Sequence, residues 1–179
     1  MNLTAQDKEH LTSAKQLLAK RDYGECIQTF NEFAQRGHIA SPAALGEIYF
    51  RGGNGVLRDY SKARYWLEKV DNFTFSPPTV YKLALIYYKG LGVSVDYEKA
   101  YALFRRLALK RLPHGLVMVG LMHKDKEGVL FKPRLAQTCF RAALKSNGLN
   151  FVERCSVAWM ILGNCGDAMR AGKKRSSLP

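Results

Sequence analysis

The chain has 179 residues, of which 47% are hydrophobic and 24% charged, a composition that indicates a folded protein and argues against extended disorder. No apolar run approaches the roughly 18 residues of a membrane-spanning helix, and the polar start of the chain is unlike a signal peptide, so we expect a cytoplasmic protein. The net charge is +13 and rises from zero over residues 1–40 to +5 over 41–110 and +8 over 111–179. Such a gradient favours encounters with polyanions or acidic protein surfaces, although a charge that only maintains solubility explains it equally well.

The first predicted element is a helix over residues 4–20. Its apolar residues recur at helical spacing and are Leu11, Ala14, Leu17 and Leu18. A second helix, from Asp22 to Gln35, completes a helical hairpin with it. Glu25 follows Asp22 by three positions, which resembles a capping box at the start of this second helix. We interpret the hairpin as an atypical first cap of a repeat array.

A repeat follows this hairpin. Residues 45–63 and 83–100 align at an offset of 38 before their glycines and 37 after them, because the first glycine cluster has one extra residue. A weaker third copy covers residues 119–140 at an offset of 36. Self-similarity at this period is the signature of a repeated supersecondary unit.

Each repeat is predicted to form two helices. In the clearest copy the second helix has one apolar stripe, formed by Tyr97, Ala100, Tyr101, Phe104, Leu107 and Ala108. The matching stripe of the first helix is formed by Val80, Leu83, Ala84 and Tyr87. Asp22, Asp59 and Asp96 each precede a second helix, where a carboxylate can accept hydrogen bonds from exposed amides. In the third copy Pro133 stands at the expected helix start, a position that tolerates proline.

Two short helices with one apolar face each are stable only when the next pair covers that face. The sequence therefore predicts an all-α fold, an α-solenoid of stacked antiparallel helical hairpins with about nine helices, whose first helices build the concave face. We expect one domain over residues 1–168, followed by a basic, disordered tail over 169–179. Its predicted parts are hairpins at 4–37, 41–71, 78–110 and 113–147 and a closing helix at 151–164.

The repeats resemble the Sel-one-like repeat, a relative of the tetratricopeptide repeat, whose pattern is roughly L-G-x-x-Y-x-x-G-x-G-V-x-x-D-x-x-K-A-x-x-W. The first copy matches it at Leu45, Gly46, Tyr49, Gly52, Gly55, Val56, Asp59, Lys62, Ala63 and Trp66. The second matches it at Leu83, Tyr87, Gly90, Gly92, Val93, Asp96, Lys99 and Ala100. The third departs from it at His123, Lys126 and Lys132-Pro133, so its turn is expected to deviate. The resemblance implies a protein that mediates protein–protein interactions, often in assembly or signalling.

Nothing in the sequence points to catalysis, so we expect no enzyme, no cofactor and no metal. Neither glycine cluster has the strand–turn–helix context or the Lys-Ser/Thr ending of a nucleotide-binding loop. The four histidines, at positions 10, 38, 114 and 123, are interpreted as surface or turn residues, because a zinc site needs three or four convergent ligands. The four cysteines, at 26, 139, 155 and 165, are interpreted as free buried thiols.

The candidate binding residues lie on first helices. Arg51, Lys89 and Lys124 hold nearly the same place in the three copies, and beside aromatic side chains such a column of cations suits a peptide carboxylate or an acidic segment. A solvated helix edge is the alternative interpretation of each position. The predicted partner-binding residues are Glu47, Arg51, Tyr81, Lys82, Tyr88, Lys89 and Lys124.

We therefore expect a non-catalytic adaptor or scaffold, a monomer or weak homodimer, that binds an acidic protein or peptide on the concave face. One alternative is an inhibitory or toxin-neutralising subunit that masks an acidic partner. Another is nucleic-acid binding through the basic C-terminal half, although no nucleic-acid-binding motif is present. The basic clusters that would serve it are Arg105-Arg106, Lys110-Arg111 and Lys173-Lys174-Arg175.

Overall fold

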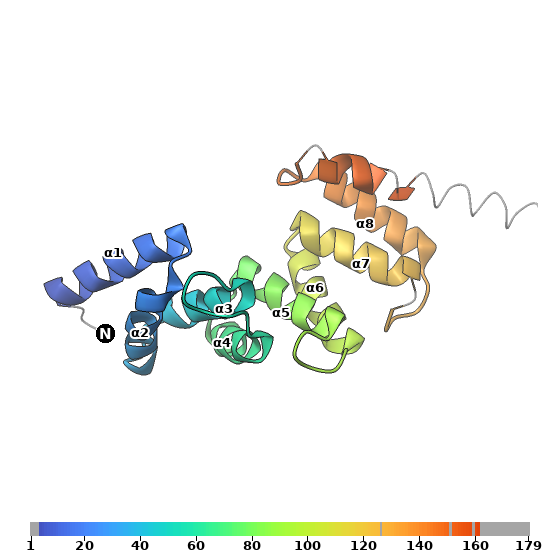
Figure 1. Cartoon of the computed structure of the whole chain (residues 1–179). Helices are drawn as coiled ribbons and strands as arrows, with labels where there is room; N and C mark the ends of the chain where they lie inside the picture. The colour runs from blue at the N-terminus through green and yellow to red at the C-terminus, as the bar shows by residue number, and fades with distance from the viewer. Residues whose placement is uncertain (1–3, 126, 151, 159, 162–179) are drawn as a thin grey trace, which may run out of the picture. The chain divides into compact units, whose positions relative to one another are not determined.

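The computed structural model describes residues 4–161, apart from residues 126, 151 and 159 and the side chain at position 73. The chain divides between Val95 and Asp96 into two compact units (Figure 1), and each is described by itself. In the first unit the helices are α1 (Ala5–Lys20), α2 (Tyr23–Gln35), α3 (Ser41–Arg51), α4 (Tyr60–Phe73) and α5 (Pro77–Lys89). In the second they are α6 (Tyr97–Leu109), α7 (Pro113–Asp125) and α8 (Pro133–Lys145), and residues 152–158 and 160–161 are also helical.

Within each unit, every helix packs against the one that follows it, so the predicted all-α solenoid of helical hairpins is confirmed. The only β-type pairing in the described residues consists of isolated bridges in the first glycine turn, where Asn54 pairs with Asp22 and Gly53 with Val56. Residues 162–164 of the predicted closing helix, Cys165 and the predicted tail at 169–179 lie outside the described residues.

The second helices begin as predicted in two hairpins but not in the first. Asp59 and Asp96 each accept a hydrogen bond from a main-chain amide three residues on, at 2.9 Å, and these bonds lower the pKa of both carboxyl groups. The capping role expected of Asp22 is wrong, because its side chain caps nothing. The loop of the next hairpin covers this helix start instead, and the Asn54 carbonyl accepts from the Tyr23 amide at 2.9 Å.

The capping box of the first hairpin lies one helix earlier than the sequence suggested. At the start of α1, the Asp7 amide donates to the Thr4 hydroxyl at 3.1 Å, and the Thr4 amide donates to the Asp7 carboxylate at 3.0 Å. The same carboxylate accepts two hydrogen bonds from Arg36, both 2.9 Å long, which hold the pKa of Asp7 well below its usual range. These contacts connect the start of α1 to the end of α2.

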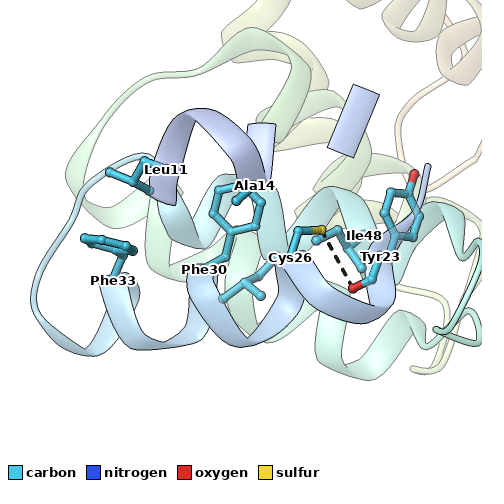
Figure 2. Close-up of a cluster of buried hydrophobic side chains, with 8 residues drawn as sticks. Leu11, Ala14, Tyr23, Cys26, Phe30, Phe33 and Ile48 are labelled. Atoms are coloured by element: carbon cyan, nitrogen blue, oxygen red, sulfur yellow. Dashed lines mark hydrogen bonds between the residues drawn. The ribbon is translucent and has the colours of Figure 1, made fainter. Parts of the chain in front are cut away.

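The core of the first unit forms where α1, α2 and α3 meet (Figure 2). Its buried members are Leu11, Ala14, Tyr23, Cys26, Phe30, Phe33, Leu45 and Ile48. The Cys26 thiol lies among them and bonds to the main-chain carbonyls of Asp22 and Tyr23, at 3.4 and 3.7 Å. Burial raises the pKa of Cys26 and of Cys139, as expected for buried free thiols. Cys155 is free but exposed, so its predicted burial is wrong.

The core of the second unit closes with the last helical segment. Ala136, Phe140 and Val157 are fully or almost fully buried there, and Met160 and Ile161 pack against them. Gly120 of α7 makes this packing possible, because a Cβ at that position would lie 2.5 Å from the Phe140 ring.

A turn contact recurs along the chain. Gly55, Gly92 and Gly128 have φ of 81°, 64° and 65°, in the left-handed region that favours glycine. A Cβ on them would lie within 3 Å of Gly24, Ser61 and Tyr97, respectively, each at the start of the preceding second helix. The separation is 31 positions every time, and in the middle turn the Ser61 hydroxyl donates to the Gly92 carbonyl at 3.1 Å. The third turn thus keeps this contact despite its departures from the repeat pattern.

His123 is buried, with 3% of its surface exposed, so its interpretation as a surface or turn residue is wrong. It takes the place of the repeat tyrosine and faces into the hairpin. Its Nδ1 lies 2.9 Å from the Leu130 carbonyl and donates to it, which in the neutral ring leaves Nε2, 3.1 Å from the Tyr101 hydroxyl, as the acceptor of that hydroxyl. The imidazole thereby satisfies a carbonyl of the third turn.

Candidate interaction groove

The first helices of three successive hairpins line one groove in the first unit. It encloses about 320 Å³, and α1, α3 and the start of α5 supply most of its wall. We call it the first-helix groove, and its lining residues are Lys15, Leu18, Phe30, His38, Ala40, Ala43, Ala44, Glu47, Ser76, Pro78, Thr79 and Lys82. The small side chains of three alanines on one wall leave the groove open. Helices α3 and α5, which form two of its sides, contact each other directly.

Glu47 organises the charges of this groove. Its carboxylate pairs with Arg51 one turn along α3 and with Lys82 on α5, so the second pair crosses from one hairpin to the next. The Lys82 side chain is only 18% exposed, which makes it a bound part of the groove wall rather than a solvated lysine. One carboxylate thus faces two cations, and the site keeps a positive excess.

Lys15 and His38 occupy the other side of the groove. His38 is half-buried, and its Nδ1 lies 2.7 Å from the Ser41 hydroxyl. Burial, together with the nearby Lys15 ammonium, lowers the pKa of His38, which favours the neutral imidazole at neutral pH. The lasting positive charges of the lining are therefore Lys15 and Lys82.

The structure brings together part of the predicted site. Glu47 and Lys82 line the groove, and Arg51 joins them through its ion pair while it lines a separate hollow. Tyr81 and Tyr88 are half-buried and Lys89 is exposed on α5, outside the groove lining. Lys124 is half-buried on α7, in the second unit.

Sequence reasoning missed the contribution of the first hairpin. Lys15, Leu18 and His38 lie outside the repeat pattern, so a comparison of repeat copies could not align them with the later first helices. The usable signal was the apolar stripe of α1. It places Lys15 directly after the buried Ala14, at the margin of the face that packs on the next hairpin.

The groove places the ammonium groups of Lys15 and Lys82 beside small side chains, an arrangement that can bind an anionic segment. In the part of the chain that the structure describes, no three His, Cys, Asp or Glu side chains are grouped so as to hold a metal ion. Among the same residues, no helix has both the length and the hydropathy needed to cross a bilayer.

Comparison with known proteins agrees with the repeat pattern. The family model of the Sel1 repeat, which is the Sel-one-like repeat named above, matches residues 43–69 and 77–111. A curated relative, the ERAD-associated E3 ubiquitin-protein ligase component HRD3B of Arabidopsis thaliana, is 30% identical over 106 residues, which are 59% of this chain and 16% of the relative. The resemblance inferred from the sequence is confirmed.

Two solved structures have the same fold. A protective antigen of uropathogenic Escherichia coli with an SLR fold superposes with a TM-score of 0.66 at 24% identity, over 82% of this chain and 34% of the antigen. A Sel1 repeat protein from Oxalobacter formigenes superposes with a TM-score of 0.63 at 19% identity, over 76% of this chain and 58% of that protein. The chain thus spans only part of each of these three proteins.

Proposed function

This chain carries Sel1 repeats, which are protein–protein interaction modules, and we propose that it is a non-catalytic adaptor that holds a segment of a partner protein in the first-helix groove. The observation that carries the proposal is the convergence of α1, α3 and α5 on one groove, whose wall is joined across hairpins by the Glu47–Lys82 pair. A ligand held there would contact three hairpins at once.

The charges of the groove favour an acidic segment. Glu47 is the only carboxylate among the described lining residues, and it already pairs with Arg51 and Lys82. A carboxylate of the partner can therefore pair with Lys15. A second carboxylate can share Lys82 with Glu47. Charge-assisted hydrogen bonds of this kind are the stronger ones at a protein surface. The alanine wall leaves room for the main chain of the segment beside these contacts.

The named relative is consistent with a role in assembly. HRD3B is described as a component of a ligase complex, so its matching region belongs to a protein that works in association with others. We extend only this general role to the present chain.

The proposal is tested by affinity capture with the whole chain as bait and quantitative mass spectrometry of the captured proteins. Lys15→Glu inverts a groove charge, whereas Lys8→Glu inverts an exposed charge two turns away on the same helix and outside the lining. Lys82→Gln removes the second groove charge and leaves Glu47 paired with Arg51. We expect Lys15→Glu and Lys82→Gln each to reduce capture of a stoichiometric partner about tenfold, the loss of about 1.4 kcal/mol.

Lys8→Glu should capture the partner like the unmodified chain, and all three variants should keep their helicity by circular dichroism. Equal capture by every bait would place the binding surface elsewhere. Conversion of a small molecule by the purified chain, abolished by the same groove variants, would make the groove an active site instead.

A further inference from the structure

A second groove lies wholly within the second unit, and the adaptor proposal does not use it. It encloses about 790 Å³ between the ends of α6 and α8, and we call it the α6–α8 groove. Its lining residues are Ala108, Leu109, Arg111, Leu116, Thr138, Arg141, Ala142, Lys145 and Ser146. These residues combine three cations with an aliphatic surface, and none of the described lining residues is a carboxylate or an aromatic ring.

Four of the five acidic residues that the structure describes in this unit are located away from the groove. Asp96 and Glu98 lie at the start of α6, and Asp125 and Glu127 at the end of α7, which is the opposite end of these antiparallel helices. Thirteen residues span about 20 Å of helix, more than twice the roughly 8 Å over which physiological salt screens a charge. Glu153, which follows α8, accepts from the Asn150 amide at 2.8 Å and lies 3.4 Å from His114.

The three groove cations therefore have no counter-charge among the residues that the structure describes. Within the described residues, Arg111, Arg141 and Lys145 form no ion pair or side-chain hydrogen bond. Helix α8 carries Arg134, Arg141 and Lys145 and no acidic residue at all. Arg141 and Lys145 are four positions apart on one helix face, a spacing at which like charges repel and destabilise the helix.

The backbone at Arg111 is also unfavourable for an isolated fold. Its φ of 56° lies in the left-handed region, at the position after a helix where glycine is commonest. The Arg111 amide donates to the Ala108 carbonyl and the Leu112 amide to the Leu107 carbonyl, so the turn is fully formed with arginine in place. Beside it, Leu109 is 71% exposed. Folding alone would favour glycine at 111 and a polar residue at 109.

We propose that the α6–α8 groove binds an acidic segment of a partner protein that also carries an aliphatic side chain. Its carboxylates pair with Arg111, Arg141 and Lys145, and its aliphatic side chain covers Leu109 and Leu116. Two features that are unfavourable in the free chain are then compensated, because the like charges are neutralised and the exposed leucine is buried. A single-stranded nucleic acid fits less well, because none of the described lining residues offers an aromatic ring on which a base could stack.

The test uses the whole chain and a fluorescein-labelled peptide in which one leucine is flanked on each side by four glutamates. Fluorescence anisotropy at physiological ionic strength measures its affinity. We expect Arg141→Glu to weaken binding at least about tenfold. Arg134→Glu is the matched control, because it inverts an exposed arginine on the same helix face two turns away and outside the groove. It should change the affinity less than about twofold.

The aliphatic contact is tested with a peptide that has serine in place of leucine. We expect this peptide to bind about fivefold more weakly to the unmodified chain, and the difference to be smaller in Leu109→Ala, where Leu116 alone remains. Because an acidic peptide can also bind the first-helix groove, the titrations are repeated in a Lys15→Glu background. Arg141→Glu should weaken binding by the same factor in that background, which separates this site from the first-helix groove. The helical circular dichroism signal should be the same in all variants.

Three results would overturn the proposal. If Arg134→Glu and Arg141→Glu weaken peptide binding equally, the binding reflects general charge attraction and not the groove. If the unmodified chain does not bind the peptide, the groove is not a binding site for an acidic segment. A labelled oligothymidine with the same number of charges that binds as tightly as the peptide, and loses affinity with Arg141→Glu, would identify a nucleic-acid surface instead.

Discussion

The two units use the same hairpin architecture but place their charged side chains differently. In the first unit, two ion pairs and a hydrogen bond join helices: Asp7 pairs with Arg36, Glu47 pairs with Lys82, and the Tyr87 hydroxyl donates to Glu68. In the second unit the described helices are joined by an apolar core, by the buried imidazole of His123 and by the contact between His114 and Glu153, and three cations line an open groove. A repeat can thus use its polar side chains to hold neighbouring hairpins together or keep them for a partner.

If the cores of the units are separate, a defect in one should stay in it. Phe140→Ala removes the largest side chain of the second core and should cost about 3–5 kcal/mol. Residue-resolved hydrogen exchange should show faster exchange in α7 and α8 and little change in α1, α2 and α3. Phe30→Ala, the counterpart in the first core, should show the reverse. A uniform increase along the chain in either variant would contradict the comparison.

The first helices carry a small residue at equivalent positions, Gly46, Ala84 and Gly120, and the two glycines should not tolerate alanine equally. A Cβ at 120 would meet the Phe140 ring at 2.5 Å, whereas one at 46 would meet the end of the flexible Leu67 side chain at 2.6 Å. We expect Gly120→Ala to cost about 1–3 kcal/mol and Gly46→Ala less than about 1 kcal/mol in denaturant titrations. Similar costs would show that the ring can move as readily as the leucine.

The smallest effects concern the helix caps. Asp59→Ala and Asp96→Ala should each cost about 1 kcal/mol, because each carboxylate accepts a main-chain hydrogen bond, whereas Asp22→Ala should cost a few tenths at most. The lowered pKa of Asp59 and Asp96 means that their contribution is complete above the ordinary aspartate pKa and is lost as the pH falls through the folded-state value. Thermal unfolding at neutral and at strongly acidic pH measures this. An equal cost for all three variants at neutral pH would refute the assignment.

Apolar periodicity and capping residues predicted the fold, because both depend on residues only a few positions apart. Buried residues of α5 recur at the spacing of the apolar stripe, and Asp59 and Asp96 stand where exposed amides need an acceptor. The predictions that were wrong depended on residues far along the chain. Asp22 could be assigned a cap from its neighbours, but the Asn54 carbonyl that covers its helix start comes from the next hairpin.

The candidate sites show the same limit. Glu47 and Lys82 lie on different hairpins, and no periodicity within one helix indicates that they pair. The α6–α8 groove brings Arg111 together with Arg141 and Lys145, some thirty residues later. The sequence showed that the C-terminal half is basic, but not that these three side chains line one groove. His123 lay outside the repeat consensus, and only its contacts with Tyr101 and Leu130 show why it is buried.

The glycine turn that rests on the preceding helix start has a consequence for how such chains lengthen. Gly55, Gly92 and Gly128 each lie against a residue 31 positions earlier, at the start of the second helix of the preceding hairpin. Each of these turns therefore packs on the hairpin that precedes its own. Deleting a single helix would remove the turn that covers the start of a preceding second helix. Duplicating a single helix would bring a second turn to the same helix start. Evolutionary gain or loss should therefore occur in whole increments of about 37 residues, and engineered chimaeras should be spliced at matching positions of two repeats.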